Sequence, residues 1–241
     1  MKTVQFAPLE PKVVLGIAAH PDDLDYGAAG TMAGFAEAGA DIHYLILTDG
    51  SKGSDNSTIS SAELIKIREK EQRQAVKAIG GKGVDFLGYP DAELQITMSL
   101  KKDIVRVIRT IKPDVVITMD PSMLYSANRG FINHPDHRAA GQAALDAVFP
   151  LARDHLTFPE LYADGYEPHK TKTVLLVNFD NNNFIVDISK TFDKKIAALA
   201  AHASQVSDIG ATEQWLKAMA GKIGGQAGYA LGESFMRIDL Q

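Results

Sequence analysis

The sequence of 241 residues contains no cysteine. Disulfide bonds, zinc sites built from thiolates and a cysteine nucleophile are therefore excluded, and any metal ion must be bound by nitrogen and oxygen ligands. Catalysis, if there is any, is left to the side chains of His, Asp, Glu, Ser and Lys.

The sequence also lacks long basic runs and long apolar runs. Its formal net charge is −5, which gives no electrostatic signature for binding nucleic acid or an anionic membrane surface. The apolar run at residues 13–19 follows Glu10 and leads directly into His20, which is typical of a buried strand rather than a signal peptide. No stretch approaches the length of a membrane-spanning helix. We expect one cytoplasmic domain over residues 1–241 that acts on a small molecule.

Apolar runs and helical patterns alternate along the first half of the chain. Four short apolar runs are predicted strands: residues 13–19, 42–48, 84–89 and 114–119. Helical patterns lie between them: residues 27–39, 61–79 and 100–111. Ser60 and Glu63 fit a capping box at the start of the second helix. Strands that alternate with helices predict an α/β fold with a mainly parallel sheet and helices on both faces.

The pattern changes in the second half of the chain. Residues 173–179 and 184–188 are strand-like runs joined by residues 180–183 (Asp-Asn-Asn-Asn), which predicts a hairpin on the edge of the sheet. Two helical segments follow, at residues 190–203 and around residues 212–223. No internal repeat is visible.

Two polar clusters follow strands of the predicted sheet. Residues 20–23 (His-Pro-Asp-Asp) end the first strand, and residues 133–137 (Asn-His-Pro-Asp-His) follow the loop after the fourth strand. Ligands of open α/β sheets bind at the carboxyl ends of the strands, so we expect the two clusters to converge. Asn133 is expected to cap a helix beginning at His134 or Pro135, which places His134 and His137 on one face of its first turn.

These clusters contain the residues that a catalytic metal site requires. Such a site takes three His or carboxylate ligands and keeps one position for water, and a set of this kind is supplied by His20, Asp23 and His137. Asp22 is placed to take a proton from the activated water, and His134 to stabilise the oxyanion or protonate the leaving nitrogen. Asp136 is expected to orient or charge His134. A solvated, capped loop is the simpler interpretation, but the pairing of two clusters at strand ends favours a metal ion.

At these residues the sequence resembles the LmbE-like or PIG-L-type N-deacetylases. The first motif of that family, a small residue followed by His-Pro-Asp-Asp, corresponds to residues 19–23, and the second, His-Pro-Asp-His, to residues 134–137. Further matches occur in order along the chain: Thr48-Asp49-Gly50, Arg68 with Glu71, Phe86-Leu87-Gly88-Tyr89 before Asp91, Lys112-Pro113-Asp114, and Ala201-His202-Ala203-Ser204-Gln205. The resemblance covers residues 13–205.

The resemblance carries several expectations. It implies a Rossmann-like fold and a zinc ion held by His20, Asp23 and His137, with Fe²⁺ as another candidate ion. It implies that Asp22 is the general base and that His134 is the electrophilic or acid residue. The implied substrates are N-acetylated amino sugars or their conjugates. Related proteins are often assembled from several chains, so a homo-oligomer is expected.

Other residues are predicted to touch the substrate. Arg68 is expected to bind substrate hydroxyls or a carboxylate, the alternative being an ion pair with Glu71 on a helix surface. Asn128 and Arg129, in the loop before the second cluster, are also expected to contact the substrate. His202, on a predicted helix, is expected to be structural.

The sequence departs from the family at one position. Some members place a mobile tyrosine shortly before the second motif, where this chain has Phe131 and Ile132. A tyrosine hydroxyl for the oxyanion would have to come from elsewhere, and Tyr125 is a candidate.

Two other functions fit part of the pattern. Two histidines and one carboxylate also form the facial triad of non-haem iron oxygenases. That triad is usually found on β-rich folds, whereas this chain alternates helices and strands. The second alternative is a carbohydrate-binding protein that keeps the metal but has no turnover, and the presence of Asp22 and His134 argues against it because neither is needed to hold a ligand.

Overall fold

A computed structural model describes residues 7–127 and 130–241. Seven strands form one sheet in the order β3-β2-β1-β4-β7-β9-β8. These strands are β1 (Val13–Ala18), β2 (Asp41–Thr48), β3 (Gly83–Tyr89), β4 (Val115–Met119), β7 (Thr173–Val177), β8 (Phe184–Asp187) and β9 (Gly232–Asp239). The first five of these are parallel to one another, while β9 is antiparallel to both β7 and β8. The predicted α/β fold with a mainly parallel sheet is confirmed.

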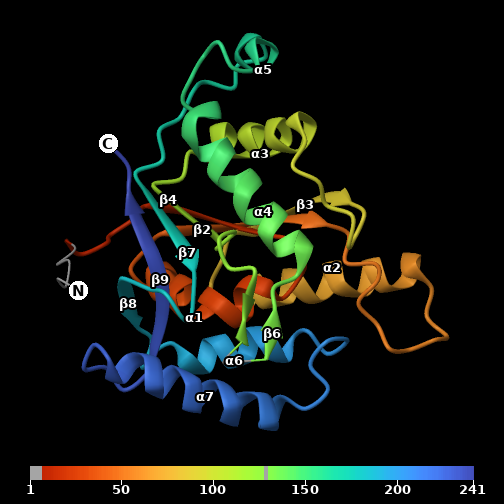
Figure 1. The fold of residues 1–241 in the computed structure, drawn as a ribbon, viewed down its shortest axis with the longest axis vertical. Coiled ribbons are helices and arrows are strands. Elements are labelled where there is room, and N and C mark those ends of the chain that lie inside the picture. The colour runs from red at the N-terminus through yellow and green to blue at the C-terminus, as the bar shows by residue number, and fades with distance from the viewer. Residues whose placement is uncertain (1–6, 128–129) are drawn as a thin grey trace.

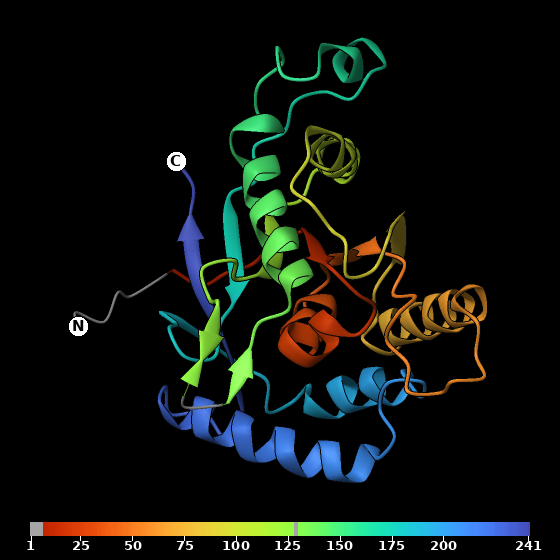
Figure 2. The same cartoon turned by 45° about the vertical axis from the view of Figure 1, so that its right-hand side comes forward.

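Helices cover both faces of this sheet (Figure 1). They are α1 (Asp23–Glu37), α2 (Ser61–Ala78), α3 (Met98–Ile111), α4 (Pro135–Asp146), α5 (Pro159–Ala163), α6 (Phe192–Ala200) and α7 (Ile209–Gly225). Figure 2 shows α3 and α4 on one side of the sheet and α1 and α2 on the other, with α6 and α7 as a further layer outside α1. Within the described residues, no helix is both long and apolar enough to cross a membrane.

Successive side chains of a strand point to opposite faces of the sheet, so each buried strand contributes to the apolar core on both faces. Val14 and Ala18 of β1 pack with α1 and α2, whereas Leu15 and Ile17 pack with α3 and α4. All four side chains are fully buried. A strand buried on both faces has no polar alternation, which is why the sequence of β1 is a continuous apolar run.

Local signals place the helices. The capping box before α2 is present, since the Ser60 hydroxyl accepts from the Glu63 N–H and the Glu63 carboxylate accepts from the Ser60 N–H. Gly141 of α4 allows that helix to approach β4, because a Cβ atom there would collide with the Met119 carbonyl oxygen. Close packing of α4 on β4 fixes the start of α4 beside the end of β1.

The predicted edge hairpin is wrong. β7 and β8 are not paired with each other; the C-terminal strand β9 lies between them, so that Val177 pairs with Phe235 and Phe184 pairs with the same residue from the other side. The β9 strand was not predicted. It joins β7 and β8 by long-range pairing, which the local pattern at residues 180–183 does not reveal.

The strand order puts the two polar clusters side by side. From β1 the chain continues to β2 and β3 on one side, then returns to add β4 on the other side of β1. The carboxyl ends of β1 and β4 therefore flank the point where the strand order reverses, with Ile17 opposite Thr118 in the parallel register. This switch point is where open α/β sheets bind ligands.

Candidate active site

The loop between β1 and α1 carries the first polar cluster in a strained conformation. Asp22 has a φ angle of +95°, in the left-handed region that residues other than glycine rarely adopt. Its backbone N–H donates to Gln72 Oε1 at 2.9 Å, and Arg68 Nη2 donates to the Pro21 carbonyl oxygen at 2.8 Å. Two side chains of α2 thus hold the loop in a conformation of the kind that is kept mainly at functional sites.

The second polar cluster forms the start of α4. His134 is the N-cap residue, and its Nδ1 accepts from the Asp136 backbone N–H at 3.2 Å. The prediction that Asn133 caps this helix is wrong, because its amide group is used elsewhere. Asn133 Oδ1 lies 3.2 Å from His137 Nδ1, and its Nδ2 donates to the Met123 carbonyl oxygen at 2.8 Å.

The three predicted metal ligands lie together. Asp23 Oδ1 is 3.0 Å from His137 Nε2, and Asp23 Oδ2 is 3.5 Å from His20 Nδ1. The ring centroids of His20 and His137 are 5.3 Å apart. The Asp23 carboxylate therefore contacts both histidines of the predicted ligand set.

Both histidines are held on the side away from Asp23. His20 Nε2 lies 3.0 Å from Asp91 Oδ1 and 3.3 Å from Asp136 Oδ2. His137 Nδ1 faces the Asn133 amide oxygen. Histidine ligands in metal sites commonly donate their second ring N–H to a carboxylate or carbonyl oxygen. The same arrangement here directs His20 Nδ1 and His137 Nε2 toward Asp23.

The Asp136 carboxylate, expected to orient or charge His134, faces His20 instead. It accepts from the backbone N–H groups of Ala92 at 2.7 Å and Leu94 at 3.2 Å and also faces His20. With its oxygens engaged by these donors, the carboxylate makes no hydrogen bond to His134 within the described residues. Only the backbone N–H of Asp136 contacts His134. Asp136 therefore orients His20 rather than His134.

His134 is expected to be neutral in these surroundings. Burial lowers the pKa of His134, and positive charge on His20 and His137 lowers it further. Because Nδ1 accepts the Asp136 N–H, the proton of the neutral ring lies on Nε2. The ring can then donate one hydrogen bond, which suits stabilisation of an oxyanion better than delivery of a proton from a cation.

The carboxylates make this site favourable for positive charge. Burial alone would lower the pKa of His20, but Asp23, Asp136 and Asp91 around it raise that pKa to about 12. Burial would raise the pKa of Asp23, but His137 and His20 hold it well below its usual range. Two imidazoles beside several carboxylates therefore fit a divalent cation, which would bind where the ring protons now lie.

Asp22 lies beside these ligands in a different environment. Burial and the adjacent Asp23 carboxylate raise the pKa of Asp22 to about 7, against the attraction of Arg68. Arg68 Nη2 lies 3.6 Å from Asp22 Oδ1. A carboxyl group that titrates near neutral pH can both take and return a proton.

A buried hydrogen-bonded network around Asp25 connects to the backbone of Asp22. Asp25 Oδ2 accepts from Gln72 Nε2 at 2.9 Å and lies 2.8 Å from His202 Nε2, while Asp25 Oδ1 accepts from the Tyr44 hydroxyl at 3.0 Å. Asp25 and His202 are both fully buried. Gln72 joins this network to the Asp22 backbone through its other amide atom. His202, expected to be structural, therefore reaches the site through Asp25 and Gln72.

Among the described residues, two groups of three have ligand atoms within 4.8 Å of one another: His20, His134 and His137, and His20, Asp91 and Asp136. The predicted set of His20, Asp23 and His137 is not one of them, although Asp23 contacts both histidines. In the second group the carboxylates also accept backbone N–H groups, those of Lys52 for Asp91 and of Ala92 and Leu94 for Asp136. The first group differs from the predicted set by holding His134 in place of Asp23.

Arg68, predicted to contact substrate, is buried. Its guanidinium group donates to the Gly50 carbonyl oxygen at 3.0 Å, while Glu71 bonds to the backbone and hydroxyl of Ser204. The two side chains are thus used separately and not as a surface ion pair. Arg68 Nε has no hydrogen-bond partner among the residues that the structure describes. Its contact with substrate stays a prediction.

A small hairpin lies beside the site, since its residue Phe131 lines the same cavity as Asp23 and His137. It consists of β5 (Tyr125–Ser126) and β6 (Phe131–Ile132), which are antiparallel. Asn128 and Arg129, predicted to contact substrate, lie outside the described residues. Tyr125, the candidate for a tyrosine hydroxyl, is 64% exposed.

Two residues of the site, Asp91 and Gln72, were not predicted from the sequence. Asp91 follows β3, whose carboxyl end lies on the same edge of the sheet as that of β1, so its position after a strand was a usable signal. Gln72 is four residues after Arg68 and therefore lies on the same face of α2. The identity of its partners depends on the left-handed conformation of Asp22, which the sequence does not reveal.

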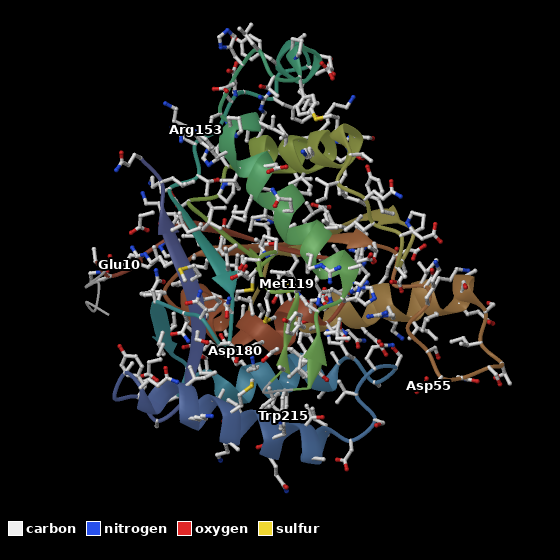
Figure 3. The ribbon with its side chains drawn as sticks, viewed as in Figure 1. Glu10, Asp55, Met119, Arg153, Asp180 and Trp215 are labelled. Carbon is white, nitrogen blue, oxygen red and sulfur yellow. The ribbon has the colours of Figure 1, made fainter. Side chains whose placement is uncertain are left out.

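A cavity of about 570 Å³ opens beside the ligands. The polar residues that line it are Asp23, Tyr26, Asp120, Asn133 and His137. Apolar side chains come from the segment after β4, the hairpin, the end of β7 and the segment after it, and α7: Met123, Phe131, Val177, Phe179, Trp215 and Met219. Figure 3 shows Met119, which also lines the cavity, at the end of β4 and Trp215 on α7 below it.

The chain is similar to known deacetylases. The sequence model described as "PIG-L: GlcNAc-PI de-N-acetylase" matches residues 15–148. A diacetylchitobiose deacetylase of Thermococcus kodakarensis is 36% identical over 194 residues, covering 80% of this chain and 70% of that protein. A probable N-acetyl-alpha-D-glucosaminyl L-malate deacetylase 2 of Bacillus anthracis is 31% identical over 197 residues, 80% of each chain.

Solved structures that are similar over almost the whole chain include N,N'-diacetylchitobiose deacetylase from Pyrococcus horikoshii in complex with its inhibitor MPG. The TM-score is 0.87 at 30% sequence identity, and the match covers 95% of this chain and 85% of that one.

Proposed function

Because the chain belongs to the PIG-L family of GlcNAc-PI de-N-acetylases, we propose that it hydrolyses the amide bond of an N-acetylated amino sugar or of a conjugate of one. The observation that carries this proposal is the contact of the Asp23 carboxylate with both His20 and His137, whose other ring nitrogens are held by Asp91, Asp136 and Asn133. Two histidines whose second ring nitrogens are held in this way are oriented as metal ligands usually are.

We propose zinc as the ion and His20, Asp23 and His137 as its ligands. Two imidazoles and one carboxylate are a common catalytic zinc set that leaves a position for water. Fe²⁺ binds the same donor types and is the second candidate. Held by these residues, a divalent ion would supply polarisation of the amide carbonyl group and a lower pKa for a water molecule.

Side chains of the protein carry out the proton transfers and stabilise the oxyanion. Asp22 takes a proton from the attacking water as the new C–O bond forms. His134 donates a hydrogen bond from Nε2 to the oxygen of the tetrahedral species. Asp22 returns its proton to the nitrogen, the C–N bond breaks, and a carboxylate and a free amine leave. Gln72 and Arg68 keep Asp22 in the conformation that this exchange requires.

Three residues keep a proposed role in substrate binding. Arg68 is close to Asp22, and we propose that its guanidinium group contacts a hydroxyl group of the sugar. Asn128 and Arg129 keep their predicted role as substrate contacts. Asp91 is buried at the Nε2 edge of His20 and orients that ring.

The two other functions have less support. A facial-triad oxygenase would need the same three ligands, but the parallel α/β fold and the deacetylase relatives favour hydrolysis. A carbohydrate-binding protein without turnover would not need Asp22 to be held in a strained conformation by two side chains of α2. Cytoplasmic location and homo-oligomer formation stay predictions.

The experiment is a hydrolysis assay with metal analysis. Purified protein is incubated with N-acetylglucosamine, its β-linked oligomers and its conjugates, and the free amine and acetate are measured. We expect amine release that stops after treatment with a chelator and returns with Zn²⁺. Binding of the sugars without release of amine would show a binding protein, and oxygen consumption with Fe²⁺ would show an oxygenase.

A further inference from the structure

The cavity beside the ligands is larger and more apolar than an acetyl group needs. Its volume of about 570 Å³ is within the range of pockets that hold whole ligands. The methyl group of an acetamide would fill a small part of it. The wall formed by Met123, Val177, Phe179, Trp215 and Met219 presents apolar surface along the rest of its length.

This wall offers few hydrogen-bond partners for the hydroxyl groups of a sugar. Burying hydroxyl groups against apolar side chains without hydrogen bonds is costly, whereas each buried methylene group of an alkyl chain is stabilising. The polar atoms lining the cavity come from residues at its ligand end, such as Asp23, Asn133 and His137, and from Asp120. The Asp120 carboxylate already accepts from Asn178 Nδ2 at 2.6 Å and from the Ser122 N–H at 2.8 Å.

The cavity reaches the ligands on the Asp23 side of His20. His20 faces Asp23 with Nδ1 and faces Asp91 with Nε2, so Asp91 lies at the opposite edge of the ring from Asp23. Asp23 and His137 line the apolar cavity, whereas Asp91 is buried and is not among its lining residues. An amide whose carbonyl carbon lies beside Asp23 and His137 can therefore extend its acyl chain along the apolar wall.

We propose that this cavity is an acyl subsite and that the chain hydrolyses amino sugars whose N-acyl group is an alkyl chain longer than acetyl. The proposal rests on the proposed function, since it assigns the acyl side of the same amide. The reaction is balanced by water alone. The water oxygen bonds to the acyl carbon, the C–N bond breaks, a proton passes to the nitrogen, and the products are a longer carboxylate and the free amino sugar.

Two substrate series test the proposal. The first is glucosamine carrying N-acetyl, N-butyryl, N-hexanoyl or N-octanoyl groups, and the second is N-acetylglucosamine with alkyl groups of the same lengths as glycosides at C1. In the first series kcat/KM should rise by up to about fourfold for each buried methylene group until the chain fills the cavity. In the second series we expect no such rise.

A variant ties the effect to the cavity wall. Trp215 is 53% exposed on α7, so its replacement should leave the fold intact. Trp215→Ala should lower the ratio of kcat/KM for N-octanoyl to that for N-acetyl substrate by about tenfold. The matched control is Tyr162→Ala, another exposed aromatic residue on a helix (45% exposed). This variant should leave the ratio unchanged.

Each outcome has one meaning. Hydrolysis of the N-acetyl substrate with kcat/KM that falls as the acyl chain grows overturns the acyl subsite but leaves the proposed function intact. A rise in the glycoside series alone assigns the cavity to the group at C1 and overturns the proposal. Equal changes of the ratio in Trp215→Ala and Tyr162→Ala also overturn it. No hydrolysis of any amide by the metal-loaded protein refutes the proposed function itself.

Discussion

Replacing His137 or His134 by alanine distinguishes the ligand set of His20, Asp23 and His137 from the set of His20, His134 and His137. If His20, Asp23 and His137 bind the ion, His137→Ala leaves two ligands and the protein should lose its metal and activity together. His134→Ala should keep about one ion per chain, because its removal leaves the triad around Asp23 untouched. Loss of the hydrogen bond from His134 Nε2 to the oxyanion should lower kcat by about 100-fold, equivalent to about 2.7 kcal/mol of transition-state stabilisation.

Metal content is measured by elemental mass spectrometry after dialysis, and kcat with an N-acetylated amino sugar. His155→Ala serves as the control, since His155 is an exposed histidine in a loop away from the ligands. It should retain both metal and turnover. Equal loss of metal in His134→Ala and His137→Ala would place His134 among the ligands. Loss in His134→Ala alone would refute the assignment of the ion to His137.

Three further predictions follow from the same contacts. Asp22→Asn should keep the metal and lower turnover by about 100-fold or more, and undiminished turnover would assign the base to another residue. Asn133→Ala removes the partner of His137 Nδ1 and should weaken metal binding by about 10- to 100-fold in a competition titration; unchanged affinity would show that the contact does not support the ligand. Burial lowers the pKa of His202, but the contact with Asp25 outweighs burial, and the pKa of His202 in the folded protein lies above its ordinary value of 6.5. The contact of His202 with Asp25 therefore stabilises the fold fully below pH 6.5, and this stabilisation is lost as the pH rises through the elevated pKa. The melting temperature of the wild type should therefore fall more than that of His202→Gln as the pH is raised from 6.5, and parallel curves would contradict this.

The sequence predicted those parts of the fold that depend on local signals. The buried strand before His20 and the capped helix after Ser60 were both predicted, because burial on two faces and helix capping each leave a mark within a few residues. The edge hairpin failed for the opposite reason. The partner of both β7 and β8 is β9, and the pairing of Val177 with Phe235 spans too much of the chain to appear in any local pattern.

The candidate site shows the same division. The convergence of His20 with His137 was predicted, because strands β1 and β4 are parallel, one polar cluster directly follows β1 and the other follows the loop after β4. Side-chain direction was not predicted. The carboxylate of Asp136 turns to His20 because the backbone N–H groups of Ala92 and Leu94, from the loop after β3, fix its oxygens. That loop reaches the site only through the tertiary fold.

The chemistry and the substrate preference of this chain are carried by different parts of it. All residues assigned to the metal ion and to proton transfer lie within residues 15–148, the part that the family model matches. Of the apolar wall of the cavity, Met123 and Phe131 also lie within this part, whereas Val177, Phe179, Trp215 and Met219 lie beyond it. The ligands must keep distances and directions fixed to tenths of an ångström, whereas an apolar wall needs only the right volume and tolerates exchange among apolar side chains. Substitutions in β7 and α7 can therefore change which acyl group is accepted without moving His20, Asp23 or His137.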